Sequence, residues 1–112
     1  MCIRDRGAGA APDMVAAWVM VGAEAVRQPE VRALYQEAVA AELAELTQLV
    51  ADCCTERRRS TDGAAALAAG LVALMEGAFQ LSSAAGDVMP AGYAADAAIS
   101  FAMLGIAAAP KA

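Results

Sequence analysis

The residues able to do chemistry are few in this chain, and they form no catalytic arrangement. The 112 residues include no His and three Cys, at positions 2, 53 and 54. The absence of His removes the commonest general base and the ligand of most zinc sites. Adjacent cysteines rarely form a disulfide with one another, so we expect Cys53 to be a small buried hydrophobic residue. We expect arginines 57–59 to form a solvated loop, because three basic residues in an acidic chain are too few for a nucleic-acid surface. The sequence therefore predicts no enzyme, no metal site and no cofactor.

Four large side chains stand out among small residues: Trp18, Tyr35, Met75 and Phe79. Their alanine neighbours leave room around them, so together they could line a cavity for a small molecule. The alternative is that each is an ordinary core residue, because large apolar side chains are buried in most folds. The sequence leaves both interpretations open.

Two acids, Glu76 and Asp96, lie within otherwise apolar segments. A carboxylate in such a place could receive a cationic ligand or pair with an arginine of a second chain, because a buried charge needs a partner. The alternative is a position at the edge of a helix, from which the acid points into solvent.

Four helical segments must position these residues, and the prolines and glycines between them mark their limits. The expected helices are residues 13–27, 29–54, 63–85 and 90–108. We expect Asp13 to cap the first helix and either Thr61 or Asp62 to cap the third. Alanine, the strongest helix former, supplies 32 of the 112 residues. The pattern predicts an all-α fold, an antiparallel bundle of four helices.

The third and fourth helices are too apolar for the first two to cover. On the third helix, Gly70 and Gly77 lie seven residues apart on one face, where another helix could approach closely. A second copy of the chain is the simplest cover, through a symmetric four-helix interface. The expected homodimer interface consists of Leu67, Gly70, Leu74, Gly77, Leu81, Ala97, Phe101 and Leu104. Packing of the same residues within one chain is the alternative.

Net charge and hydropathy exclude further classes of protein. The formal net charge of −5 argues against autonomous nucleic-acid binding, which needs a basic surface. The mean hydropathy is +0.48, yet the two most apolar stretches, residues 64–81 and 91–109, each contain an acid and consist largely of alanine. The N-terminus has no apolar segment of signal-peptide length. We therefore expect a cytoplasmic protein that does not enter a membrane.

Residues 1–12 differ from the rest of the chain. They combine a charged, patternless opening with a run of Gly and Ala. This composition is similar to translated adapter sequence at the end of a gene prediction, in which case the true gene begins further upstream; an ordinary floppy terminus is the alternative. We expect residues 1–12 to be a disordered leader and residues 13–109 to be the helical domain.

Three stretches carry a resemblance to a known family: residues 17–19 (AWV), 28–35 (QPEVRALY) and 70–77 (GLVALMEG). In this order, and followed by a loop and a final helix, they resemble the C-terminal ligand-binding and dimerisation domain of TetR-family transcriptional regulators. The subgroup most similar is that of the choline-responsive betaine-synthesis repressor. The resemblance covers residues 12–106, and it implies that the last two helices form a dimer and that the domain binds a small effector.

The chain departs from this family in one large respect, because nothing in it matches the N-terminal helix-turn-helix domain. The resemblance therefore implies a truncated regulator that senses an effector and dimerises, and that reaches DNA only through a domain absent from this chain. A different hypothesis is a helical adaptor that binds a partner helix in an apolar groove. A third hypothesis is a small membrane-associated protein.

Overall fold

A computed structural model gives the fold of the chain and describes residues 12–112. Four α-helices and a short 3-10 helix follow one another: α2 (Pro12–Ala25), α3 (Pro29–Glu56), α4 (Ala64–Ala85), η1 (Gly86–Val88) and α5 (Tyr93–Ala108). The described residues contain no strand, and the predicted all-α helical bundle is confirmed. The predicted leader lies outside the described residues, except for Pro12, which begins α2.

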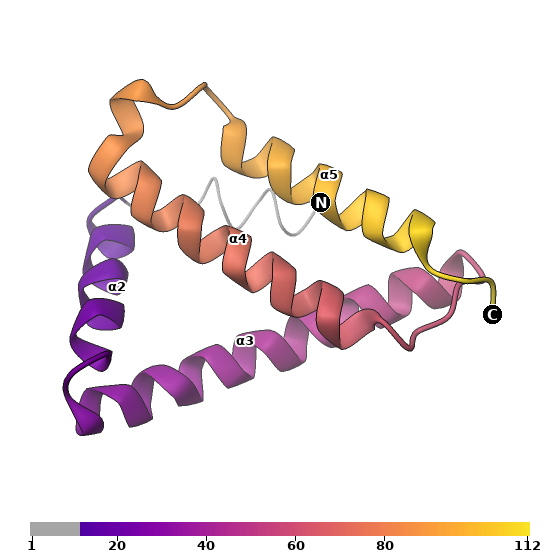
Figure 1. Ribbon diagram of the computed structural model, residues 1–112, viewed down its shortest axis with the longest axis horizontal. Coiled ribbons are helices and arrows are strands. Elements are labelled where there is room, and N and C mark those ends of the chain that lie inside the picture. Colours follow the sequence, from indigo (N-terminus) through magenta and orange to yellow (C-terminus); the bar gives the residue numbers. More distant parts are fainter. Residues whose placement is uncertain (1–11) are drawn as a thin grey trace.

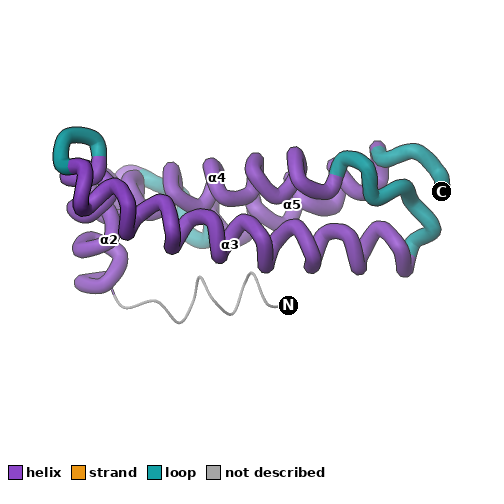
Figure 2. The backbone as a smooth tube through the Cα atoms, turned by 90° about the horizontal axis from the view of Figure 1, so that it is seen from below, coloured by secondary structure: helices purple, strands orange, loops and turns teal. Residues whose placement is uncertain are grey.

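Helices α3 and α4 form a V (Figure 1). They lie closest near residues 57–63, which join them, and they diverge towards the other end. Helix α2 lies across this open end and contacts both α3 and α4, whereas α5 runs beside α4 (Figures 1 and 2). The V with its crossing helix is the frame on which the functional residues are placed.

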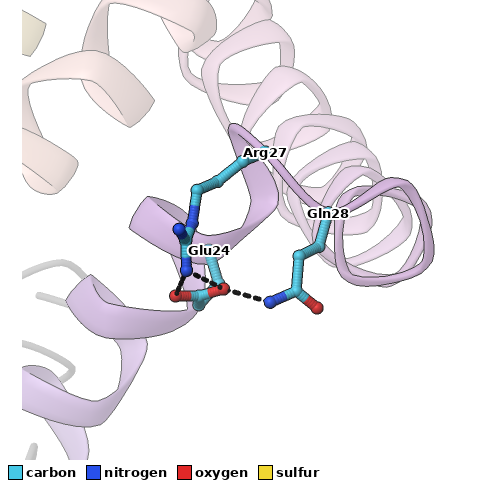
Figure 3. Close-up of polar contacts among 3 residues, drawn as sticks. All are labelled: Glu24, Arg27 and Gln28. Carbon is cyan, nitrogen blue, oxygen red and sulfur yellow. Dashed lines mark hydrogen bonds and ion pairs between the residues drawn. The ribbon is translucent and has the colours of Figure 1, made fainter.

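The corner between α2 and α3 is closed by polar side chains (Figure 3). Glu24 accepts hydrogen bonds from the side chains of Arg27 and Gln28, and its ion pair with Arg27 measures 2.9 Å. The Arg32 guanidinium donates to the carbonyl of Ala25 at 2.9 Å and to the next carbonyl at 2.7 Å. These bonds supply partners and positive charge at the C-terminal end of α2. Helix α2 therefore ends at Ala25, two residues before the predicted limit.

The predicted helix caps are wrong. Asp13 is not an N-cap, because α2 already begins at Pro12 and Asp13 lies inside the first turn. Its negative charge there still stabilises the helix, because it lies near the positive end of the helix dipole. Neither Thr61 nor Asp62 caps α4. The residue preceding that helix is Gly63, and no side chain hydrogen-bonds to the helix start.

Helix α5 begins at Tyr93, three residues after the predicted start at Pro90. Gly92 has a φ of 73°, a left-handed conformation that an α-helix cannot contain and that glycine adopts without a steric cost. The Tyr93 N–H donates to the Pro90 carbonyl at 3.2 Å, so residues 90–93 form a turn before the helix.

The hydrophobic core lies between the second half of α3, the first half of α4, and α5. Its buried members are Leu46, Val50, Cys54, Ala64, Ala68, Leu71, Ala98, Ala102 and Ile106. Cys54 is 2% exposed, whereas Cys53 is only half-buried, so the expectation that Cys53 is the buried cysteine is wrong by one position. None of the core residues belongs to α2.

Two glycines allow α4 and α5 to approach closely. A Cβ atom on Gly70 would lie 2.5 Å from Cζ of Phe101, and one on Gly105 would lie 2.5 Å from Cδ1 of Leu67. Phe101 of α5 therefore fills a notch on α4, and Leu67 of α4 fills a notch on α5. Part of the stripe that was expected to meet a second chain thus packs within the chain.

Candidate functional site

Three helices bring Trp18, Tyr35 and Glu76 together, and we call these residues the Glu76 network. The indole Nε1 of Trp18 donates to both carboxylate oxygens of Glu76, at 2.9 and 3.0 Å. The Tyr35 hydroxyl donates to Oε2 of Glu76 at 3.3 Å. The rings of Trp18 and Tyr35 stack, with centroids 4.8 Å apart and an angle of 23° between their planes. One carboxylate of α4 is thus held by a donor from α2 and a donor from α3.

The local sequence explains how these side chains reach one another. Gly22 lies one turn after Trp18 on α2, and the Tyr35 ring packs against it; a Cβ atom there would lie 3.3 Å from Cε2 of Tyr35. A larger residue at position 22 would push the tyrosine away from the tryptophan. Glu76 is the one charged residue of α4, and its hydrogen-bond donors come from α2 and α3.

The protonation of Tyr35 suits its role as a donor. Burial raises the pKa of Tyr35 above its ordinary value of 10.0, and the charge of Glu76, the hydrogen bond to Glu76 and the charge of Glu42 raise this pKa further. Tyr35 is therefore protonated at neutral pH. Within residues 12–112 no Lys or Arg forms an ion pair with Glu76. The Glu76 network is a negative charge stabilised by two neutral donors.

Of the four predicted ligand residues, two are in direct contact with one another. Trp18 and Tyr35 meet in the Glu76 network, whereas Met75 packs against the hydrophobic core. Phe79 is half-buried one turn after Met75, and no aromatic ring among residues 12–112 stacks with it.

The two acids differ in their surroundings. Glu76 is half-buried and accepts hydrogen bonds within the chain, so the alternative in which it simply points into solvent is wrong. Asp96 is exposed in the first turn of α5. Sequence reasoning missed the link between Glu76 and the two aromatic residues. The signal was the lone acid in an apolar helix, which requires donors from elsewhere in the fold.

The predicted dimer residues fall into two groups. Leu67 and Gly70 pack against α5, and Leu74 packs against the core. The other group is open in this chain: Leu81, Ala97 and Leu104 are exposed, and a Cβ atom on Gly77 would meet no side chain and no other helix within 4 Å. Phe101 belongs to both groups, because it packs against Gly70 and yet stays 39% exposed.

A partly open cavity of about 170 Å³ lies at the closed end of the V, and the sequence did not indicate it. Its lining residues are Val50, Cys54, Ser60, Gly63, Ala64, Leu67, Gly105, Ala108, Ala109 and Pro110. One side is closed by the C-terminal segment, where the Ser60 N–H donates to the Pro110 carbonyl at 2.6 Å. Ligand pockets are usually larger, roughly 300–1,000 Å³. The cavity contains none of the predicted ligand residues.

Residues 12–112 contain no group of His, Cys, Asp and Glu side chains that could hold a metal ion. One helical stretch in this part of the chain, Ala64–Val88, is long and apolar enough to cross a membrane by length and composition. Core helices of soluble proteins share this property, but such helices are mostly buried, whereas 22% of the apolar window of this stretch is buried in the described fold.

A family model described as "BetI-type transcriptional repressor, C-terminal" matches residues 6–105. The resemblance found in the sequence covered residues 12–106, so the match begins six residues earlier and ends one residue earlier. It includes Trp18, Tyr35 and Glu76 and most of α5. No curated protein and no solved structure matches the chain.

Proposed function

Since the chain belongs to the family of BetI-type transcriptional repressor C-terminal domains of TetR-like regulators, we propose that it dimerises through α4 and α5 and binds a small effector at the Glu76 network. The family supports an effector-binding and dimerisation domain, and the resemblance seen in the sequence is confirmed. In the whole regulator, effector binding would shift the population of two conformations that hold the DNA-reading heads at different spacings. Operator binding would belong to a helix-turn-helix domain that residues 12–112 do not contain, and the regulator would act in the cytoplasm, without a membrane.

The observation that carries the dimer proposal is the uncovered apolar surface on α4 and α5. Leu81, Phe101 and Leu104 are exposed in one chain, and Leu104 is 71% exposed. The open side of Gly77 adds a place where a helix of a second chain could approach closely. A symmetric contact would bury these side chains, and apolar burial stabilises association by about 25 cal/mol per Å².

The Glu76 network supports the proposed effector site. Its carboxylate has neutral donors and no cationic partner within residues 12–112, so a bound cation would add attraction without displacing an existing ion pair. The Trp18 and Tyr35 rings beside it favour an organic cation, because the face of an aromatic ring attracts positive charge. Met75 and Phe79 on α4 remain candidates for the apolar part of the site.

Sedimentation of the purified chain tests the dimer. We expect a mass near twice 11.3 kDa at micromolar concentration without detergent. Leu104→Glu should weaken dimerisation by at least about tenfold, because it places a charge in the interface. Leu34→Glu is the matched control, since Leu34 is 69% exposed and belongs to α3, which is not part of the proposed interface. A well-folded monomer would overturn the dimer and favour the adaptor hypothesis, in which the same surface binds a partner helix.

Trp18 fluorescence tests the effector site, because Trp18 is the only tryptophan of the chain. Tetramethylammonium should change its emission saturably, whereas the neutral tert-butanol of similar shape should not. Glu76→Gln should abolish the response to the cation. An equal response to both probes, or one unaffected by Glu76→Gln, would contradict a cation site at Glu76.

A further inference from the structure

Helix α2 is attached to the domain differently from the other helices. The hydrophobic core contains residues of α3, α4 and α5 and none of α2. The buried residue of α2 is Ala25, its last, while Met14, Met20 and Val21 are exposed. Burial of apolar side chains is the dominant favourable contribution to folding, so α2 is stabilised by it less than the other helices are. Helix α2 still packs against α3 and α4 through half-buried residues such as Val15 and Val19, and polar contacts are a second contribution to its position.

Hydrogen bonds to Glu76 are such contacts. Trp18 reaches the carboxylate from α2 and Tyr35 reaches it from α3, so one side chain of α4 joins three helices. Figure 1 shows α2 lying across the open end of the V that α3 and α4 form, and none of the three residues belongs to the core. Removing the Glu76 carboxylate would leave the half-buried donors of Trp18 and Tyr35 without a hydrogen-bond partner. An unsatisfied buried donor is costly, so these side chains would move towards water.

A short turn joins α2 to α3. Residues 26–28 are not helical. The N–H groups of Val26 and Arg27 donate to carbonyls three residues earlier, at 3.3 and 3.1 Å, which is the pattern of a turn. The side chains of Glu24 and Arg32 hold this corner, as shown for Glu24 in Figure 3. Helix α2 is thus held by the corner at its C-terminal end and by Glu76 at Trp18.

We propose that Glu76 is the positioning residue of α2: its carboxylate holds α2 across the open end of α3 and α4, and loss of these hydrogen bonds frees α2 to move about residues 26–28 while the core stays folded. The regulatory part of this inference rests on the proposed function: an effector that binds the Glu76 carboxylate in place of Trp18 and Tyr35 would break these hydrogen bonds and let α2 move.

Hydrogen exchange and Trp18 fluorescence test the proposal without any effector. In Glu76→Leu, the amides of α2 should exchange at least about tenfold faster, while buried amides of the core such as that of Leu71 keep their protection. The emission of Trp18 should shift to the red as the indole enters water. Glu76→Gln should restore most of the protection of α2, because its amide oxygen still accepts a hydrogen bond. Asp96→Leu is the control, since this acid is exposed and should leave α2 unchanged.

Trp18→Phe provides a second variant, because it removes the indole donor and keeps an aromatic ring at the same position. It should increase exchange in α2 by less than Glu76→Leu does and leave the core protected. Unchanged exchange of α2 in both variants would overturn the proposal. Equal loss of protection in α2 and in the core would overturn it too, because α2 would then be part of one cooperative unit.

These results separate the positioning role from the proposed function. A chain that sediments as a monomer, but whose α2 loosens in Glu76→Leu, would refute the dimer and keep the role of Glu76. A chain that binds tetramethylammonium at Glu76, but whose α2 exchanges at the wild-type rate in Glu76→Leu and in Trp18→Phe, would keep the effector site and refute the positioning role.

Discussion

The indole nitrogen of Trp18 lies 2.9 and 3.0 Å from the two carboxylate oxygens of Glu76, a residue 58 positions later in the chain. The contact joins α2 to the second half of α4, and Tyr35 joins α3 to the same carboxylate. The network therefore reports on the relative positions of three helices. Its state can be followed through the single tryptophan and through the ionisation of Tyr35.

The raised pKa of Tyr35 predicts a loss of stability at high pH. The unfolded chain releases the phenolic proton near pH 10, whereas the folded chain holds it to a higher pH. The contribution of Tyr35 to the free energy of unfolding is therefore complete below about pH 10 and is lost as pH rises through the folded pKa. Urea unfolding between pH 8 and pH 11 should show a steeper loss for the wild type than for Tyr35→Phe. Parallel pH profiles for the two proteins would contradict the raised pKa.

Alanine substitutions at Gly70 and Gly77 should change the free energy of unfolding differently, because Gly70 packs against another helix of the chain and Gly77 does not. Gly77→Ala should stabilise the monomer by up to about 1 kcal/mol, because Ala is the better helix former and its Cβ meets no atom. Gly70→Ala should be at least about 1 kcal/mol less stable than Gly77→Ala, because its Cβ would lie 2.5 Å from Cζ of Phe101 and the ring would have to move. Urea unfolding at a concentration that favours the monomer measures both. Equal stabilisation would show that Phe101 yields without cost.

Gly77→Leu distinguishes a dimer interface from a solvent-exposed helix face. The monomer should fold as well as the wild type, because the space around Gly77 is open within one chain. The proposed dimer should weaken by at least about tenfold, because the new side chain would separate the two helices at their closest approach. Gly86→Leu is the matched control, since Gly86 also has open space but lies beyond the end of α4. A variant that sediments like the wild type would remove Gly77 from the interface.

Leu71→Ala should destabilise the domain more than any single exposed change. Leu71 is 1% exposed at the centre of the core, and such truncations cost about 2–5 kcal/mol. This is a large part of the roughly 5–15 kcal/mol by which domains are stable. Thermal unfolding measures the effect, with Leu34→Ala as a control that should change stability by no more than about 0.5 kcal/mol. Similar losses in both variants would place the core elsewhere.

Much of the secondary structure was predictable from local chemistry. Pro29 begins α3 at a helix position where its missing N–H costs nothing, and Gly86 ends α4, both as expected. The start of α5 was not predictable from Pro90, because the left-handed conformation of Gly92 delays the helix to Tyr93. Capping by Thr61 or Asp62 was wrong for a related reason: the loop from 57 to 63 contacts the C-terminal segment, where the backbones of Arg59 and Lys111 form an isolated antiparallel β-bridge.

The sequence by itself determined that the protein is all-α, where most of its helices begin and end, and to which family it belongs, because helix propensity, helix breakers and short motifs act over a few residues. The tertiary structure alone decided that Leu67 fills the notch at Gly105 and that Trp18 reaches Glu76. Periodicity shows which residues share a helix face, but it contains neither the crossing angle nor the rotation of two helices. These depend on how all the side chains between the helices pack together.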